Sequence, residues 1–433
     1  MEFAIKQIAD VYKANITLNG ITVLAGKNNT GKSTVSKSLW CMIRSLDNIG
    51  KQVEHERGVR YARILERILH ESTYDTPLVR NSYGKVLQMA QDFARKSEGG
   101  SLDPDLVKRE LRESFPSLGE EPQIGLLFED ELNEGVDRVA ELVEFSTIPS
   151  GDIARVLLQN RLLNEFHTQV NNVDTHSKGT MVLKRGKLEF TASIINDSVV
   201  DFCVGTGLRQ TAIYLDDPFV LDYYSSTVAR RRHADARNED HRSHANALLH
   251  PAETYGGDVL GSIMADRKID EVMGRLDSVV SGLTASSRKH GIVYRRPEGK
   301  SDLDVRSISS GMKTFAGIKT LLHENRIHDG DILILDEPEN HLHPEWQLVF
   351  AELIVLLYRA FNLRILLATH SPYFLRAIEV YSAHYGMADR CKYYHAMHDE
   401  DGSFFQDVTF DTDEIYEDMS VPFDLLDELM PEE

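Results

Sequence analysis

The stretch Asp331-Ile-Leu-Ile-Leu-Asp-Glu-Pro338 decides the fold of this 433-residue chain. Its unbroken apolar run, Ile332 to Leu335, is typical of a strand buried on both faces of a parallel sheet. Two acids follow at the carboxyl end of the strand, which is the edge at which open α/β sheets bind ligands. We therefore expect Asp336 and Glu337 to lie where a phosphate-bound metal and an attacking water are handled. Pro338 ends the strand, because proline cannot donate to the ladder.

A second decisive stretch lies near the amino end, where the apolar strand Ile21–Ala25 precedes Gly26-Lys-Asn-Asn-Thr-Gly-Lys-Ser33. This stretch matches G-x-x-x-x-G-K-[ST] in full, and a helical pattern follows it. In such a P-loop, backbone N–H groups and the positive end of the helix hold phosphates. Lys32 reaches the β- and γ-phosphates, and the Ser33 hydroxyl binds Mg²⁺. The predicted nucleotide-binding residues are Gly26, Asn28, Asn29, Thr30, Gly31, Lys32, Ser33 and Thr34.

Two more motifs flank the acid-ended strand. Ser307-Ile-Ser-Ser-Gly-Met-Lys-Thr-Phe315 comes shortly before it and leads into a helical run. Leu366-Leu-Ala-Thr-His-Ser-Pro372 comes shortly after it, as a second apolar strand that ends in His370. Serine before a helix is also what ordinary N-capping prefers. The order of the motifs along the chain therefore carries the argument.

This order, P-loop, Ser-x-Gly signature, Walker B strand and histidine, resembles the nucleotide-binding head of ABC-type ATPases. The forms DEPENHLHPEWQ, ATHSPYFL and SSGMK are similar to the OLD-like branch, which is common in bacterial phage-defence systems. In size and motif order the chain is similar to the ATPase subunits of the Septu and PARIS systems. The resemblance covers the head segments, about half of the chain.

The resemblance implies ATP and Mg²⁺ as ligands and gives the motif residues their roles. Asp336 binds Mg²⁺ together with Ser33, Glu337 is the general base, and His370 senses the γ-phosphate. Ser309, Ser310 and Gly311 contact the ATP held by the other subunit of a head-to-head dimer. The signature departs from the usual form, since Ile-Ser-Ser-Gly-Met replaces Leu-Ser-Gly-Gly-Gln, and no glutamine is assigned to the Q-loop.

The head motifs span Gly26 to His370, so we expect one discontinuous head with insertions. The expected fold is α/β, a P-loop ABC-type ATPase head with a mixed sheet and an antiparallel side sheet, interrupted by helical insertions. The expected segments are the first head part with the P-loop (1–45), a helical insertion (46–177), the antiparallel head sheet (178–219), a second helical insertion (220–289), the second head part with the signature, Walker B and histidine switch (290–397), and an acidic C-terminal tail (398–433).

Within the head, Phe3 to Leu18 are expected to form an edge strand and a turn. Tyr12 or Lys13 could flank the adenine, although a packed core tyrosine is favoured. Alternating polarity and turn residues between Gly179 and Val204 predict antiparallel hairpins.

Two clusters outside the main motifs could also carry chemistry. Thr211 to Pro218 predicts a strand that ends in Asp216 and Asp217, for which a strand-end turn is favoured over catalysis. His241 and His244 have metal-ligand spacing within an Arg- and His-rich stretch, residues 228–250. No third ligand stands at a fixed offset, so a solvated helix is favoured.

The net charge of −20 is uneven, because residues 399–433 carry 14 acids and no lysine or arginine. Acidic tails are usually solvated or docked to a basic partner, and this reading is favoured. The aromatic and aliphatic residues between these acids nevertheless suggest that part of the tail folds on the body or on another protein. The acidic charge of the chain does not favour binding of nucleic acid, although the basic triplet Arg230 to Arg232 leaves a contact with nucleic acid or an acidic protein open. No apolar stretch is long enough for a membrane helix, no signal peptide is evident, and the three cysteines lie far apart, which favours the cytoplasm.

The favoured function is a phage-defence ATPase that forms a homodimer or higher even oligomer and controls a separately encoded effector, expected to be a nuclease. The alternative is a RecF- or SMC-like ATPase of DNA repair or recombination, which would be expected to show a basic face. An ABC transporter subunit is the least favoured. We do not expect a nuclease site in this chain, because its one coherent acid pair, Asp336 and Glu337, is committed to ATP, and the roughly 60 residues after His370 are too few for a TOPRIM domain.

Overall fold

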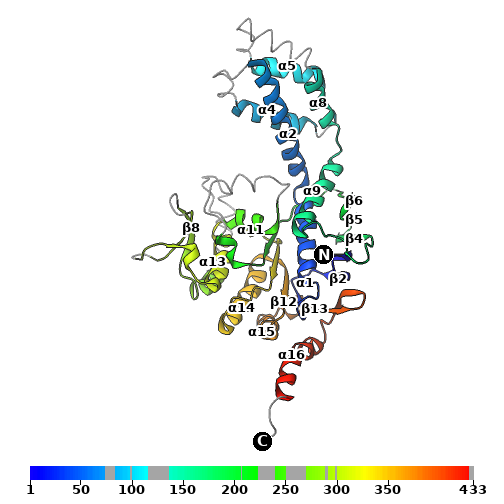
Figure 1. Cartoon of the computed structure of the whole chain (residues 1–433). Coiled ribbons are helices and arrows are strands. Elements are labelled where there is room, and N and C mark those ends of the chain that lie inside the picture. The colour runs from blue at the N-terminus through cyan, green and yellow to red at the C-terminus, as the bar shows by residue number, and fades with distance from the viewer. Residues whose placement is uncertain are drawn as a thin grey trace. The chain divides into compact units, whose positions relative to one another are not determined.

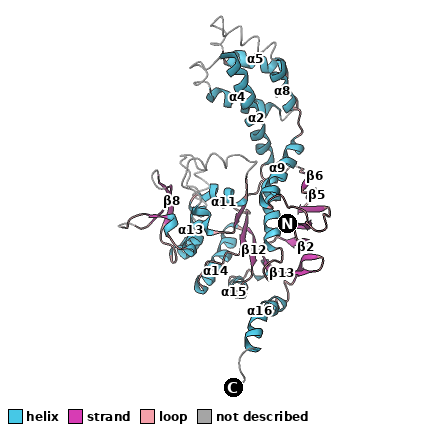
Figure 2. Cartoon of the chain, in the orientation of Figure 1, coloured by secondary structure: helices cyan, strands magenta, loops and turns pink. Residues whose placement is uncertain are grey.

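The computed structural model describes residues 1–73, 83–97, 100–115, 136–205, 207–222, 239–249, 270–287, 291–297 and 300–428. The chain divides into two compact units (Figures 1 and 2). The head unit comprises Met1–Asp47 and Arg155–Glu433, and the helical unit comprises Asn48–Ala154. The chain leaves the head unit after its P-loop helix and returns to it within the helix α9 (Ser150–Glu165).

An eleven-stranded mixed sheet organises the head unit, in the order β6-β5-β4-β1-β2-β14-β13-β3-β12-β11-β7. The structure thus confirms the predicted α/β class with a mixed sheet. The strands are β1 (Glu2–Ile8), β2 (Val11–Thr17), β3 (Ile21–Ala25), β4 (Gly179–Arg185), β5 (Leu188–Ile195), β6 (Ser198–Cys203), β7 (Ala212–Leu215), β11 (Ile332–Asp336), β12 (Arg364–Thr369), β13 (Cys391–Asp399) and β14 (Gly402–Asp407).

The strands β13, β3, β12, β11 and β7 run parallel to one another. Both β3 and β11 are buried along their whole length, as their apolar sequences require. Asp336 pairs with Ala368, and Thr369 pairs with Ala25. This register brings the ends of the P-loop strand, the acid-ended strand and the histidine-ended strand to one edge of the sheet.

The remaining strands correct three expectations. The segment Phe3–Leu18 holds two strands, β1 and β2, which lie inside the sheet rather than at its edge because β4 and β14 pair with their outer sides. Strand β7 belongs to the parallel part, although it was expected with the antiparallel strands. A separate three-stranded antiparallel sheet contains β8 (Leu283–Ser287), in a segment expected to be helical, with β9 (Gly291–Arg295) and β10 (Leu303–Asp304).

Helices cover both faces of the parallel strands. Helix α1 (Lys32–Leu46) contacts β7, β11 and β12 on one face. On the other face, Ile21, Val23 and Ala25 of β3 join one apolar core with residues of α13, α14 and α15. Strand residues alternate between these faces, as the period of two dictates. The bounds of the latter helices are α13 (Ser310–His323), α14 (Pro344–Phe361) and α15 (Pro372–His384).

The acidic C-terminal segment is folded over much of its length, so it is a part of the head unit rather than a tail. Strand β14 is hydrogen-bonded between β13 and β2. Helix α16 (Asp413–Glu428) follows, and its Ile415 is fully buried in the apolar core. The expectation that part of this segment packs on the body therefore agrees with the burial of Ile415.

The helical unit contains α2 (Ile49–Thr73), α4 (Tyr83–Lys96), α5 (Pro104–Ser114) and α8 (Val136–Ser146) among its described residues. These helices enclose an apolar core of their own, which includes Tyr61, Phe93 and Leu142. Across the described part of the whole chain, no helix combines the length and apolarity that a membrane span needs.

Candidate nucleotide site

The loop between β3 and α1 has a backbone that two of its glycines make possible. Gly26 has a φ of 155°, and a Cβ on it would lie 2.3 Å from the carbonyl oxygen of Ala396. Gly31 has a φ of 77°, and its Cβ would lie 2.6 Å from Cγ2 of Val11. Neither position has room for a side chain. The sequence-predicted loop Gly26–Ser33 therefore adopts a tight, glycine-dependent turn directly before a helix N-terminus, which is the arrangement that binds phosphate.

Lys32 is 4% exposed and turns back onto this loop. Its Nζ donates to the carbonyl oxygen of Gly26 at 2.9 Å and to that of Lys27 at 2.6 Å. Burial lowers the pKa of Lys32, while the nearby carboxylates of Glu337 and Asp336 act in the opposite direction. The amine is thus held at the sheet edge among acids, with hydrogen bonds that a phosphate oxygen can replace.

Asp336 is buried and has one satisfied and one unsatisfied oxygen. Its Oδ2 accepts a hydrogen bond of 2.7 Å from the hydroxyl of Tyr214, whereas Oδ1 is buried without a hydrogen-bond partner. Burial raises the pKa of Asp336, and the hydrogen bond from Tyr214 and the nearby Ser33 hydroxyl oppose the rise. A buried carboxylate oxygen without a partner is costly, and a hard cation satisfies it well. Asp336 and Ser33 therefore fit the Mg²⁺ site that the sequence assigns to them.

Glu337 and His370 lie together at the same edge. Glu337 Oε1 is 3.3 Å from Nδ1 of His370, and Glu337 Oε2 accepts a hydrogen bond of 2.8 Å from Nδ2 of Asn340. Contact with His370 lowers the pKa of Glu337 to about 2, and the same contact raises the pKa of His370. Glu337 also has a φ of 49°, the left-handed region that non-glycine residues rarely adopt. Such backbone strain clusters at functional positions.

Glu339 is a buried acid in the loop after β11, and sequence reasoning did not identify it. It accepts hydrogen bonds from the hydroxyl of Thr369 and from the backbone N–H of His370, the latter at 3.3 Å. It thereby ties the loop after β11 to the end of β12 and fixes the backbone that carries His370. Burial raises the pKa of Glu339.

The signature residues lie at the start of α13. Ser309 is exposed and caps the helix by accepting from the N–H of Met312 at 3.4 Å. Gly311 is buried, and a Cβ there would lie 3.0 Å from the ring of Trp346, so this glycine allows close packing against α14. Within one chain, α13 and the P-loop helix α1 lie on different sides of the parallel strands (Figure 1).

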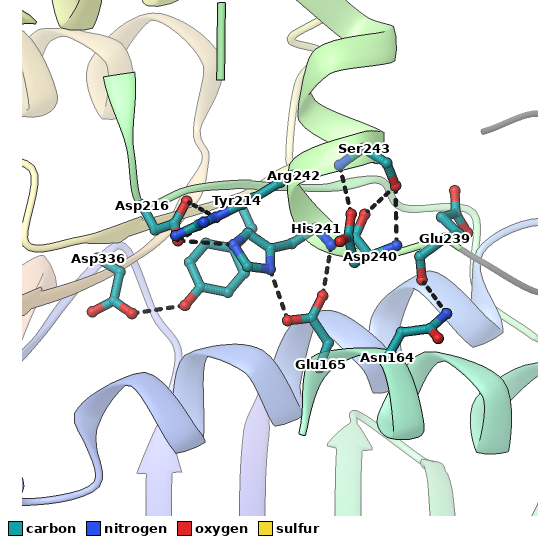
Figure 3. Close-up of polar contacts among 10 residues, drawn as sticks. All are labelled: Asn164, Glu165, Tyr214, Asp216, Glu239, Asp240, His241, Arg242, Ser243 and Asp336. Atoms are coloured by element: carbon teal, nitrogen blue, oxygen red, sulfur yellow. Dashed lines mark hydrogen bonds and ion pairs between the residues drawn. The ribbon is translucent and has the colours of Figure 1, made fainter. Parts of the chain in front are cut away.

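A buried ionic network extends from Asp336 toward α9 and α11 (His241–Leu249), as Figure 3 shows. His241 Nδ1 is 2.7 Å from Glu165 Oε2, and its Nε2 is 3.0 Å from Asp216 Oδ2. Asp216 also pairs with Arg242 at 2.6 Å. His241 and His244 are 5% and 7% exposed, so the expected solvated helix is wrong. The error arose because the charges that satisfy His241 come from distant segments.

A second ionic cluster, centred on Glu239, lies next to the first. Glu239 pairs with Arg44 of α1 and with the fully buried Arg161 of α9, each at 2.8 Å. Burial would raise the pKa of Glu239, but the two guanidinium groups lower it to about 2. Sequence reasoning missed Arg161 and Glu165. The helical spacing of the apolar residues in α9 could have identified them. Leu157, Leu158 and Leu162 define the buried face of this helix, and Arg161 and Glu165 lie on the same face.

Two other expectations concern residues near the site. Tyr12 is 38% exposed, which contradicts the packed core tyrosine. Among the described residues, no group of three or more His, Cys, Asp or Glu side chains is arranged to hold a metal ion. The residues 228–238 and His250 of the Arg- and His-rich stretch lie outside the described residues.

A comparison with protein families matches the part of the chain that carries Asp336, Glu337 and His370. Residues 209–376 match the family described as "AAA domain, putative AbiEii toxin, Type IV TA system". This match includes β7, the signature, Asp336, Glu337 and His370, and covers less than half of the chain. A search of curated proteins found no match.

Among solved structures, the chain is similar to heads of SMC proteins. The SMC head domain from Thermotoga maritima has 10% identity and a TM-score of 0.34, with 94% of this chain and 98% of that chain covered. An SmcHead bound to the C-winged helix domain of ScpA has 9% identity and a TM-score of 0.41, and the match covers 95% of this chain and 98% of that chain. A third similar structure is an Smc head domain with an extended coiled coil, bound to the C-terminal domain of ScpA derived from Pyrococcus furiosus. It has 9% identity and a TM-score of 0.34, and the match covers 99% of this chain and 98% of that chain. These TM-scores are too low to carry an argument. The structure itself shows a mixed α/β sheet in which the P-loop sequence follows the parallel strand β3.

Proposed function

We propose that this chain binds Mg·ATP at the sheet edge and hydrolyses it. The observation that carries the proposal is the convergence of Lys32, Asp336, Glu337 and His370 at the ends of three adjacent parallel strands. The P-loop would hold the phosphates through its backbone N–H groups. Lys32 would exchange its bonds to loop carbonyls for bonds to phosphate oxygens.

The remaining residues have distinct chemical tasks in this proposal. Ser33 and Asp336 would hold Mg²⁺, which when bound stabilises the negative charge on the phosphates. Glu337, which is ionised at neutral pH, would accept a hydrogen bond from the attacking water and orient it. His370 keeps Glu337 in place and presents its remaining ring nitrogen for a phosphate oxygen.

Nucleotide binding is tested with Lys32→Ala, and Lys37→Ala in the same helix serves as the control. Loss of a charge-assisted bond should weaken binding of a fluorescent ATP analogue roughly 10- to 100-fold, since such bonds contribute about 1.5–3 kcal/mol. The control variant should bind like wild type. Equal affinities of wild type and Lys32→Ala would refute the assignment of the site.

We further propose that hydrolysis requires a head-to-head dimer in which the signature of one chain completes the site of the other. The exposure of Ser309 and the separation of α13 from α1 within one chain support this. Glu337→Gln should retain ATP binding, lose turnover and accumulate as an ATP-bound dimer. Adding Ser309→Arg should abolish this dimer but not ATP binding, whereas the exposed Ser307→Arg should be neutral. Sedimentation that shows no self-association in any nucleotide state would contradict the dimer.

We also propose that the ATPase controls a separately encoded effector in antiphage defence. The matched family's description, which names a type IV toxin–antitoxin system, supports a two-protein arrangement. The other acid and histidine candidates, Asp216 and His241, are occupied with each other and with Glu165 and Arg242, which supports a structural role for them.

The effector proposal is tested by what the purified chain does alone. Incubated with plasmid, phage DNA and tRNA in Mg²⁺ or Mn²⁺, it should leave all three intact, and it should co-purify with the product of a neighbouring reading frame. Cleavage that Asp216→Ala or His241→Ala abolishes would place the nuclease in this chain. Strong stimulation of ATP hydrolysis by DNA would favour the repair or recombination alternative.

A further inference from the structure

Tyr214 lies beside the proposed metal site because of its place in the sheet. It pairs with Ile334 across the parallel strands β7 and β11, so its side chain is on the same face of the sheet as that of Asp336. The side chain is fully buried. Its hydroxyl donates to Oδ2 of Asp336 at 2.7 Å, and burial keeps the pKa of Tyr214 well above its usual value, so the hydroxyl retains its proton.

The ring of Tyr214 is held by His241. The two rings are stacked, with centroids 4.2 Å apart and an angle of 22° between their planes. His241 is itself fixed on both sides, by Glu165 at 2.7 Å and by Asp216 at 3.0 Å, and its backbone N–H donates to Glu165 at 2.6 Å (Figure 3). The tyrosine therefore has a rigid support that comes from α9, α11 and the end of β7.

The start of α11 is fixed as well, so that the support does not depend on one contact. Ser243 N–H donates to Oδ1 of Asp240 at 2.7 Å, and the Ser243 hydroxyl lies 3.0 Å from the N–H of Asp240. This reciprocal capping sets the backbone on which His241 stands. The ring of Trp40 of α1 also lies edge to face with that of His241, with centroids 6.3 Å apart.

We propose that Tyr214 is a positioning residue for Mg²⁺, which fixes the rotation of the Asp336 carboxylate so that its free oxygen faces the metal. The inference rests on the proposed Mg·ATP site. Because Tyr214 occupies Oδ2, the buried and unpaired Oδ1 is the oxygen left to coordinate. Without the hydroxyl, the carboxylate can rotate, and a metal must order it on binding.

Groups that orient metal ligands from outside the coordination sphere typically change metal affinity 10- to 100-fold when removed. We therefore expect Tyr214→Phe to weaken divalent-metal binding about tenfold. The variant keeps the ring that stacks on His241 and removes one atom. Affinity for the nucleotide without metal should be unchanged, because the Tyr214 hydroxyl bonds to Asp336, which in this proposal holds the metal rather than the phosphates.

The test uses the full chain and Mn²⁺ as the probe, with free Mn²⁺ measured by electron paramagnetic resonance in the presence of a non-hydrolysable ATP analogue. Tyr214→Phe should bind Mn²⁺ about tenfold more weakly, bind the analogue in EDTA like wild type, and hydrolyse ATP with a raised KM for Mg²⁺ and a kcat that excess Mg²⁺ restores. Tyr385→Phe, which removes a hydroxyl bonded to Glu352 at 2.8 Å in α14, is the matched control and should behave like wild type.

Three outcomes would overturn the inference, and one of them separates it from the proposed function. Mn²⁺ affinity of Tyr214→Phe equal to that of wild type would show that the hydroxyl does not position the ligand. Equal weakening of analogue binding with and without metal would indicate general damage to the site. If wild type itself binds no Mn²⁺ with the analogue, the proposed Mg·ATP site fails, and the positioning role fails with it.

Discussion

The Nζ of Lys27, the second residue of the P-loop, lies 2.5 Å from Oδ1 of Asp418 in α16. The carbonyl oxygen of the same Lys27 accepts from Lys32 at 2.6 Å. Asp418 Oδ2 is also 3.4 Å from His395 Nε2. Burial would raise the pKa of Asp418, but its bonds to Lys27 and His395 lower it. The acidic C-terminal helix thus contacts the loop Gly26–Ser33, at which we propose that phosphate binds.

This contact predicts that Asp418→Asn tightens ATP binding. The substitution removes a negative charge close to the site of an anionic ligand and frees the Lys27 amine to face it. At a separation of about 10 Å in water, one charge contributes about 0.4 kcal/mol, which corresponds to about a twofold change in Kd. The effect should shrink as salt is raised, because exposed charges are screened over about 10 Å at 0.1 M.

The measurement is a titration of a fluorescent ATP analogue at low and high salt. Glu417→Gln, an exposed acid next to Asp418, is the control for net charge on α16. If Asp418→Asn and Glu417→Gln change the Kd equally, the contact between Lys27 and Asp418 does not contribute to the affinity for ATP.

The parts of the fold that could be predicted are those with local causes. The apolar runs of β3 and β11 demand burial on both faces, and the glycines of the P-loop demand a turn that only they can adopt. The order of the motifs then brings Lys32, Asp336, Glu337 and His370 to one edge of the sheet.

The parts that could not be predicted have non-local causes. Asp216 and Glu165 are neighbours of His241 in space but far from it in sequence, so the burial of α11 was invisible to a count of local charge. The same is true of α16, where 14 acids after residue 398 predict solvation, yet Ile415 is fully buried. Tyr214 carries no motif, and its position on the same face of the sheet as Asp336 follows from strand register.

The burial of Ile415 predicts that α16 stabilises the head unit. Ile415→Ala should lower the free energy of unfolding by about 2–4 kcal/mol, because truncating a buried isoleucine loses transfer free energy and leaves a cavity. Val421→Ala on the same helix should cost much less, since Val421 is 40% exposed. Both tryptophans, Trp40 and Trp346, belong to the head unit, so their fluorescence during urea unfolding reports on it. Equal stability of the two variants would show that α16 is not docked in solution.

A chain that ends near Lys392 is a poorer test of this contact, because the truncation also deletes β14 from within the sheet.

The position of His241 between two carboxylates predicts a specific dependence of stability on pH. Burial alone would lower the pKa of His241, but the hydrogen bonds and charges of Asp216 and Glu165 raise it to about 9. A raised pKa contributes stability that is fully present below about 6.5 and is lost as pH rises through about 9. The contribution is about 3 kcal/mol, at about 1.36 kcal/mol for each pKa unit. Asp216 has its pKa lowered to about 2, so its own contribution is lost only in acid, outside this window.

His241→Gln, which keeps a polar side chain but cannot carry charge, should therefore differ most from wild type near pH 6. The difference in the free energy of unfolding of the head unit should decrease steadily between pH 6.5 and 9 and then level off. Tryptophan-detected unfolding at a series of pH values measures it, with the exposed His384→Gln as the control. The rings of Tyr214 and Trp40 also lie against His241, and Arg242 pairs with its partner Asp216. Burial raises the pKa of Tyr214 well above its usual value, so Tyr214 stays neutral throughout this range. A difference between His241→Gln and wild type that stays constant from pH 6 to 10 would show that His241 is not charged between Glu165 and Asp216.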